Sequence, residues 1–172
     1  MNKAAFNAQY RTHYHQVFGL CRRMLGSTHD AEDATQEVFM KGYRSYAHYR
    51  QHRPFGPWIK SIASNHCIDL LRRRKRLATV FSDIDEESEE SVDTTLATED
   101  ALINAHDADT INEAVIALPE KYRLPIVMAY YSDASYEDIA AKLDIKKNHV
   151  GVLLLRARQQ LRHALNSTIA EI

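Results

Sequence analysis

The sequence predicts an all-α protein made of two small helical domains joined by a flexible acidic linker. Its 172 residues include only 5 Gly and 4 Pro, and 45% of them are apolar, which is typical of a helical globular protein. Apolar residues recur at three- and four-residue steps in both halves of the chain. Between them, Thr79–Asp100 is rich in Ser, Thr, Asp and Glu and lacks that period. We therefore expect domains at residues 1–76 and 113–172 and a linker at residues 77–112.

The first domain is expected to hold three helices. An apolar stripe from Phe6 to Leu25 predicts the first, and Gly26-Ser27-Thr28 would end it and cap the next. The second opens with acids that suit the positive end of a helix dipole, and it runs to about Tyr46. Two prolines and a glycine make residues 47–57 a loop. A third helix should run from Trp58 to about Arg76.

The second domain is expected to contain a helix-turn-helix. Helical periodicity returns near Ala101 and lasts to Leu165, with Pro119 as a helix start and Pro125 as a kink or a later start. Ser135 should cap a helix over 135–143, which a turn at 144–146 joins to a second helix. Such a pair places its second helix in the DNA major groove, although a generic helical hairpin would show the same spacing. Residues 166–172 resemble a frayed tail.

The charges are segregated along the chain although the net charge is only −1. Residues 1–76 hold 14 Lys and Arg against 5 Asp and Glu, and residues 121–172 hold 8 against 5. Residues 77–120 contain 13 acids and no Lys or Arg. Two basic blocks around an acidic one suggest nucleic-acid contact in both domains.

Three features of the first domain suit nucleic acid. The run from Arg72 through Arg73, Arg74 and Lys75 to Arg76 exceeds what helix capping needs, so phosphate contact is the better explanation. Asn65 and Asp69 share a polar face and are either base-edge readers or ordinary surface groups. In the aromatic and basic stretch before the third helix, Tyr49 and Arg50 are candidates for stacking on single-stranded bases, whereas Phe55 and Trp58 suit the core.

Other functional classes lack their motifs. The sequence has no HExxH, no GxSxG and no phosphate-binding glycine loop. Cys21 and Cys67 have no CxxC partner, which argues against a zinc ribbon, a disulfide scaffold and a dithiol redox site. Met24, Met40 and Met128 are expected to fill the core. No apolar run approaches a membrane span and the N-terminus has no signal-peptide core. We expect a cytoplasmic protein with no enzyme activity, cofactor or metal.

Four segments in order resemble the extracytoplasmic-function (ECF, group IV) sigma factors of bacterial RNA polymerase, within the sigma-70 family. They are DAEDATQEVFMKGYRSY, FGPWIKSIASNHCIDLLRRRKR, LPEKYRLPIVMAYYSDASYEDIAAKL and LRARQQLR. The resemblance implies a first domain like sigma region 2 and a second like sigma region 4. Its function would be to bind core polymerase, direct it to promoters and assist DNA opening.

The resemblance also implies site residues in the first domain. The contact with the clamp coiled coil of the largest polymerase subunit would use Asp33, Gln36, Glu37, Phe39 and Lys41. The promoter −10 element would meet the loop Tyr49–Pro54, in which Arg50, Gln51, His52 and Arg53 lie, and Asn65 in IASN. The upstream duplex would meet Asp69 and the basic run at residues 72–76.

In the second domain, the resemblance implies contact with the flap of the second subunit and with the −35 element. That element lies about two duplex turns from the −10 element, or roughly 70 Å, at ~34–36 Å per turn. The residues placed on it are Ser135, Lys146, Lys147, Asn148, His149, Arg156 and Arg158. The chain departs from the family where Gly151, Val152 and Leu153 replace polar or basic reading positions. The resemblance further implies an anti-sigma factor as partner.

Two alternatives stay open on the sequence. A two-domain helix-turn-helix regulator that does not bind core polymerase would explain the basic blocks, but it would explain neither the acid-opened helix nor Asn65. A pure interaction protein, such as a sigma antagonist, would not need two basic faces. Pull-down with core polymerase separates the sigma factor from both.

Overall fold

The structure, a computed structural model, describes residues 3–49, 53–74 and 105–170. The helices in chain order are α1 (Lys3–Leu25), α2 (Thr28–Ser45), the 3-10 helix η1 (Tyr46–His48), α3 (Phe55–Arg73), α5 (Ala105–Ala117), α6 (Glu120–Tyr131), α7 (Tyr136–Leu143) and α8 (Lys147–Ala170). No strand occurs among the described residues. The prediction of an all-α chain with two helical domains is confirmed, whereas residues 75–104, which include most of the expected acidic linker, lie outside the described part.

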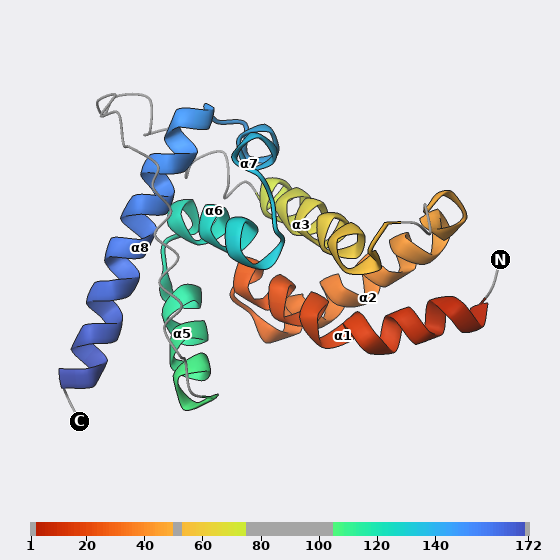
Figure 1. The fold of residues 1–172 in the computed structure, drawn as a ribbon, viewed down its shortest axis with the longest axis horizontal. Helices are drawn as coiled ribbons and strands as arrows, with labels where there is room; N and C mark the ends of the chain where they lie inside the picture. Colours follow the sequence, from red (N-terminus) through yellow and green to blue (C-terminus); the bar gives the residue numbers. More distant parts are fainter. Residues whose placement is uncertain (1–2, 50–52, 75–104, 171–172) are drawn as a thin grey trace.

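The first helical unit consists of α1, α2 and α3, which pack against one another along the right half of Figure 1. Its core includes Val17, Val38 and Ile59, one from each helix and all fully buried. At one end the ring of Phe6 meets the edges or faces of four other aromatic rings, on Phe39, Tyr43, Tyr46 and Phe55. Such edge-to-face packing places the turn after α2 and the start of α3 against the N-terminal helix.

The start of α3 differs from the prediction. Residues 47–57 were expected to form a loop, but η1 occupies Tyr46–His48 and α3 begins at Phe55. Pro57 therefore lies in the first helical turn, where a backbone N–H would have no helical partner and proline costs little. Phe55 is buried beside Phe6, and Trp58 is half-buried against the same core, as expected of both.

The second unit consists of α5, α6, α7 and α8. Helix α8 runs beside α5 and α6, and α7 packs on its N-terminal part (Figure 1). Helix α5 begins at Ala105, so residues 105–112 of the expected linker are helical. Helix α6 begins at Glu120 after Pro119 and contains Pro125, so the expected start at Pro119 is confirmed and the later start is wrong. Helix α8 continues to Ala170, which corrects the expected frayed tail from residue 166.

Serine side chains cap α2 and α7. The Ser27 hydroxyl accepts a hydrogen bond from the Asp30 backbone N–H at 3.3 Å, as the sequence predicted. Ser135 accepts from the Asp138 backbone N–H at 3.1 Å, and the Asp138 carboxylate accepts from the Ser135 backbone N–H at 3.2 Å. This reciprocal capping box fixes the first helix of the helix-turn-helix.

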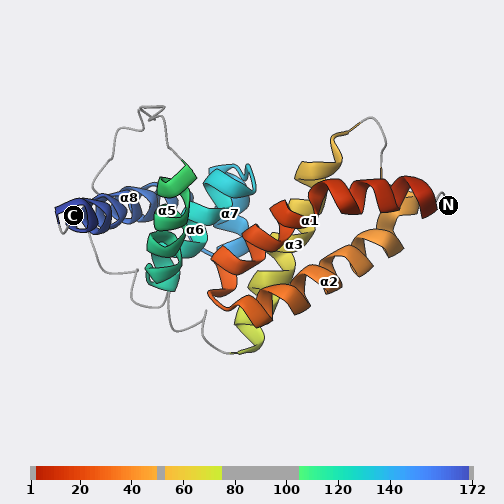
Figure 2. The ribbon, with the colours of Figure 1, turned by 90° about the horizontal axis from the view of Figure 1, so that it is seen from below.

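The two units lie in contact along the long axis of the molecule. Figures 1 and 2 both show α6 and α7 beside the first unit, and α1 contacts α5 and α6 while α3 contacts α7. The buried apolar residues of both units form one continuous hydrophobic cluster. Helix α3 and the helix-turn-helix, which both carry predicted sites, therefore meet at the boundary between the units.

Candidate polymerase and nucleic-acid interface

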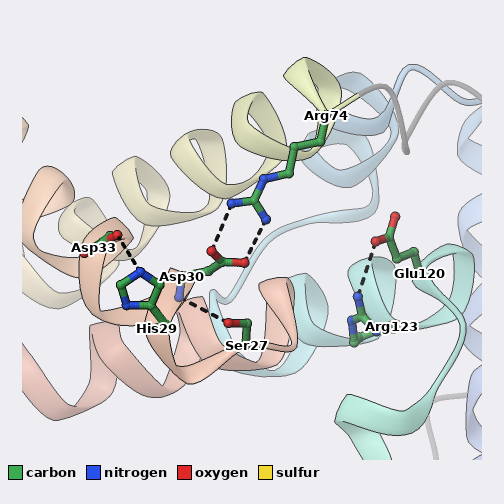
Figure 3. Close-up of polar contacts among 7 residues, drawn as sticks. All are labelled: Ser27, His29, Asp30, Asp33, Arg74, Glu120 and Arg123. Carbon is green, nitrogen blue, oxygen red and sulfur yellow. Dashed lines mark hydrogen bonds and ion pairs between the residues drawn. The ribbon is translucent and has the colours of Figure 1, made fainter.

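The outer face of α2 carries most of the residues predicted to contact polymerase. Asp33, Gln36 and Glu37 are exposed on it. His29 lies 3.7 Å from the Asp33 carboxylate in a pair exposed to solvent (Figure 3). Phe39, in contrast, is only 4% exposed and packs on the rings of Phe6 and Tyr10. Its side chain therefore supports α2 from inside and is not on the outer face.

Met40 lies on this outer face, which corrects the prediction that it fills the core. Its side chain is 47% exposed, whereas Met24 and Met128 are fully buried as predicted. The buried positions of α2 include Ala34, Val38 and Gly42, and Met40 lies on the opposite side of that helical period. An exposed methionine among Gln36 and Glu37 adds an apolar contact to an otherwise polar surface. The helical period would have revealed it in the sequence.

Lys41 is tied to α3 by a buried histidine. The Lys41 ammonium donates to Nδ1 of His66 at 2.9 Å, and His66 is buried next to Asn65. Burial lowers the pKa of His66, and the charge of Lys41 lowers it further. A neutral imidazole is the form that accepts a hydrogen bond from an ammonium group. The contact thus joins the helix predicted to contact polymerase to the helix predicted to read the −10 element.

The described part of the predicted −10 loop is held by aromatic packing. The Tyr49 ring stacks on Tyr46 with centroids 5.6 Å apart and lies 4.8 Å from the Trp58 ring. Its hydroxyl donates to the carbonyl of Arg53 across the loop. Burial of the ring and hydroxyl raises the pKa of Tyr49, and the neighbouring Tyr46 raises it further. Tyr49 therefore forms a half-buried wall of the loop, and Arg50, Gln51 and His52 lie outside the described residues.

Along α3 the polar residues continue towards the second unit. Asn65, Asp69, Arg72 and Arg73 are exposed, so they share the solvent-facing side of one helix. Two of the predicted phosphate-binding arginines already have protein partners. Arg72 Nη2 donates to the Lys142 carbonyl of α7 at 2.5 Å, and Arg74 holds the Asp30 carboxylate through two nitrogens (Figure 3). Lys75 and Arg76 lie outside the described residues.

The second arginine–carboxylate pair in Figure 3 joins Arg123 to Glu120 within the second unit. Arg123 is buried and donates to the carbonyls of Ile116 and Leu118, and its Nη2 lies 3.6 Å from Glu120. These bonds satisfy the backbone groups at the end of α5 and the start of α6. A Cβ added to Gly26, where φ is +77°, would meet the same guanidinium at 3.9 Å. Arg123 is therefore a structural group close to the boundary between the units.

The helix-turn-helix forms as predicted. Asp144, in the left-handed conformation at φ 56°, ends α7 and turns the chain into α8. Lys146, Lys147 and Asn148 are exposed at the start of α8 and His149 is half-buried, while Lys147 pairs with Glu137. The Ser135 hydroxyl is used in its capping box and also donates to Asp138 at 2.8 Å. The start of α8 therefore presents a cluster of cationic and amide groups.

The atypical residues of α8 separate into two faces. Val150, Leu153, Leu154 and Ala157 are buried and join α8 to the core. Gly151 and Val152 are half-exposed. The Tyr136 ring lies beside Gly151, and a Cβ added to this glycine would be 3.9 Å from the ring. Arg156 and Arg158 are half-buried, and Arg158 donates to the Tyr130 hydroxyl at 3.4 Å. Leu153 is therefore a core residue, and Gly151 and Val152 are the atypical positions that reach the surface.

The cysteines, far apart in sequence, meet in the core. Cys21 and Cys67 are free, fully buried, and hydrogen-bonded to each other across α1 and α3. That contact and burial raise the pKa of the Cys67 thiol. Among the described residues there is no cluster of three or more His, Cys, Asp or Glu side chains suited to a metal. Nor does any described helix have the length and apolar character to span a membrane.

Comparisons with known proteins match this arrangement. The family model for sigma-70 region 2 matches residues 9–77, and that for sigma-70 region 4 matches residues 108–161. The ECF RNA polymerase sigma factor SigW of Bacillus subtilis is 32% identical over 87% of this chain and 83% of its own length. SigE of Mycolicibacterium smegmatis is 34% identical, with 90% of this chain and 59% of that protein covered.

A solved structure shares the fold. The sigma factor RpoE of Bartonella quintana, crystallised with the anti-sigma factor NepR, matches with a TM-score of 0.60 and 23% identity. The match covers 94% of this chain and 97% of the other.

Proposed function

The chain belongs to the extracytoplasmic-function sigma factors of the sigma-70 family, and we propose that it directs core RNA polymerase to promoters and assists DNA opening. The observation that carries this proposal is the order of the two matched regions, 9–77 and 108–161, which fall on the two helical units. A helix-turn-helix regulator without polymerase contact would not need the region 2 unit.

We propose that the clamp coiled coil of the largest polymerase subunit binds the outer face of α2. Exposed Asp33, Gln36 and Glu37 supply polar contacts there, and Met40 supplies an apolar one. Lys41 is held at the edge of this face by His66. An interface with an apolar centre and a polar rim is the usual arrangement of a specific protein–protein contact. Phe39 acts in this proposal only through packing.

We propose that the loop at residues 49–54 and the exposed face of α3 meet the −10 element. The aromatic wall built on Tyr49 and Trp58 suits a base that has left the duplex stack, and Asn65 supplies amide groups for its edge. Extruding a base costs a few kcal/mol, and base–aromatic stacking returns ~1–3 kcal/mol per base. DNA opening is then driven by binding energy, and the chain has no catalysis of its own.

We propose that the helix-turn-helix reads the −35 element from the start of α8. Lys146, Lys147 and Asn148 are exposed there, with His149 beside them. Gly151 and Val152 offer little to hydrogen-bond, so base reading is concentrated in the first turn of the helix. Arg156 and Arg158 lie further along α8 and suit phosphates, while the rest of the unit contacts the polymerase flap. The protein acts in the cytoplasm with RNA polymerase, and an anti-sigma factor is a further partner.

Run-off transcription with purified core polymerase on the organism's own promoter regions tests this function. Specific transcripts are expected with the chain and core together and not with core alone. A pull-down with core polymerase accompanies the assay. Promoter binding without retention of core would instead indicate a regulator that does not bind polymerase, and would overturn the proposal.

A further inference from the structure

One side of α8 points away from the core. Four residues share this side because they recur at steps of four, three and four residues, namely Asn148, Val152, Leu155 and Gln159. The buried positions Val150 and Ala157 lie on the opposite side of the helix. Helix α8 forms the left edge of Figure 1, with α5 and α6 to one side of it. We call the four outward residues the outer stripe of α8.

The middle of the outer stripe is apolar. Val152 and Leu155 are half-exposed, and Asn148 and Gln159 at either end of them are exposed. Neither Val152 nor Leu155 belongs to the hydrophobic cluster that the buried residues of the described helices form. A single exposed apolar residue is ordinary in a protein surface. Two neighbours on the helix that a helix-turn-helix places in the major groove suggest an apolar contact with DNA.

Gly151 leaves the apolar residues open on one side. A Cβ added to this glycine would meet only the Tyr136 ring, at 3.9 Å, so no side chain rises next to Val152 there. A glycine also lets another molecule approach the helix backbone closely. A base pair can therefore come nearer to Val152 than a longer side chain at residue 151 would allow.

Cationic side chains flank the outer stripe. The helical period places Lys147 and Arg158 to one side of it and Arg156 to the other. Lys147 is exposed and also pairs with Glu137, and the two arginines are half-buried. Phosphates border the major groove on both strands, so cations on both sides of a helix suit the DNA backbone. The apolar middle of the stripe is then left to face the base edges.

Hydrogen-bond reading is concentrated in the first turn of α8, but the major groove also displays one apolar group, the C5 methyl of thymine. We propose that Val152 and Leu155 read the −35 element through thymine methyl groups, a readout that rests on the proposed function of the chain. Asn148, one turn earlier, suits the N6 and N7 atoms of an adenine.

The helix geometry fixes how the readout is spaced. Three residues of helix rise ~4.5 Å and successive base pairs lie ~3.4 Å apart, so Val152 and Leu155 reach neighbouring base pairs. A G·C pair opposite Val152 would present polar groups that valine cannot pair, and it would be selected against. The −35 element is therefore rich in A·T pairs where it faces the outer stripe.

Exchange of thymine for deoxyuridine tests the proposal because it removes only the C5 methyl group. The full chain is assembled with core polymerase on a promoter found by run-off transcription, and each thymine of the −35 element is replaced in turn. Competition electrophoresis should show binding weakened about fourfold at one or two neighbouring positions, the effect of one methyl-sized group leaving an apolar contact. Binding should stay unchanged at the other positions.

Alanine variants assign the methyl groups to side chains. Val152→Ala should remove the deoxyuridine penalty at one position, and Leu155→Ala should remove it at the neighbouring one. Gln160→Ala, exposed on α8 but off the outer stripe, is the matched control and should keep the wild-type pattern. A penalty that persists in both apolar variants would mean that the methyl groups act on the shape of the duplex, and would overturn the proposal.

A gain of specificity covers the case in which the alanine effects are too small to resolve. Arginine donates two hydrogen bonds to O6 and N7 of guanine. Selection by the Val152→Arg holoenzyme from duplexes randomised over the −35 element should return guanine at a position where wild type returns thymine. Selection of the same bases by wild type and variant would show that Val152 does not face the groove.

The outcomes separate methyl reading from the proposed function. A holoenzyme that transcribes but is indifferent to every deoxyuridine overturns methyl reading and leaves the sigma function intact. Weaker core polymerase affinity in Val152→Ala, with the deoxyuridine pattern unchanged, would make the outer stripe a polymerase contact and overturn the DNA readout. Absence of transcripts with wild type and core polymerase would overturn the proposed function itself.

Discussion

Both terminal nitrogens of Arg74 contact the carboxylate of Asp30, at 2.8 and 3.0 Å, and so join the end of α3 to the first turn of α2. The geometry is the bidentate fork that arginine forms with carboxylates. The Asp30 backbone N–H is itself held by the Ser27 cap, so the carboxylate is well placed (Figure 3). An arginine from the predicted phosphate-binding run is thus partly neutralised inside the protein.

Asp30→Asn is predicted to release Arg74 for DNA. The variant should bind non-specific duplex more tightly, and its affinity should fall more steeply with salt. One added phosphate contact changes the slope of log affinity against log salt by about 0.9. Because the pair is partly exposed, its loss should cost only about 1 kcal/mol in the free energy of unfolding.

Fluorescence anisotropy over a salt series measures this slope. Glu32→Gln, which removes an exposed acid from the same helix turn, is the matched control and should leave the slope nearly unchanged. An identical slope in Asp30→Asn would mean that Arg74 does not reach phosphate.

Glu37→Lys and Met40→Asp are each predicted to weaken binding to core polymerase on the order of tenfold, which is about 1.4 kcal/mol. Both side chains are exposed on the outer face of α2, so neither change should unfold the chain. Helical content by circular dichroism checks the fold, and surface-immobilised core polymerase measures the affinity. Asp109→Lys, exposed on α5, provides the charge-reversal control. Unchanged affinity in both α2 variants would place the polymerase contact elsewhere.

His66 is predicted to make the fold sensitive to acid. Burial, then the charge of Lys41, lowers its pKa below the ordinary 6.5. Between that lowered value and 6.5 the unfolded chain binds a proton that the folded chain does not. The free energy of unfolding should therefore decrease as pH falls below about 6.5, and level off once folded His66 is also protonated.

Urea unfolding from pH 7.5 to pH 5 tests the role of His66. His66→Gln should flatten the dependence because an amide oxygen can accept from Lys41 without titrating. His48→Gln, in an exposed position, should retain the wild-type dependence. A dependence that persists in His66→Gln would assign the acid sensitivity to other groups.

Local signals made much of the fold predictable. Ser27 and Ser135 cap the helices that they were expected to cap, since the side chain that satisfies a helix N-terminus lies within a few residues of it. Helix α3 begins earlier than predicted because Pro57 lies in its first turn, where a proline has no helical hydrogen bond to lose. Met40 is exposed although methionine is an apolar residue type, because the helical period decides which face of α2 a residue occupies.

The site was less predictable because its decisive contacts are long-range. Nothing near Lys41 in the sequence indicates His66. Cys21 and Cys67 meet only because α1 packs on α3. Sequence patterns report which residues are buried or exposed on one helix, whereas pairs between helices depend on how the helices cross.

Gly151→Ala is predicted to stabilise the protein without disturbing the helix-turn-helix. Glycine inside a helix costs roughly 0.5–1 kcal/mol relative to alanine, because it loses more backbone freedom on folding. A Cβ at this position would meet only the Tyr136 ring, at 3.9 Å, which is ordinary contact. The midpoint of urea unfolding should therefore rise, and Gly42→Ala should lower it instead, because a Cβ there would lie 2.8 Å from Ile59. If DNA approaches α8 closely at Gly151, the same alanine should weaken −35 binding while leaving core polymerase affinity intact. A stabilised variant with unchanged −35 affinity would show that the DNA contact stays within the first turn of α8, around Lys147 and Asn148.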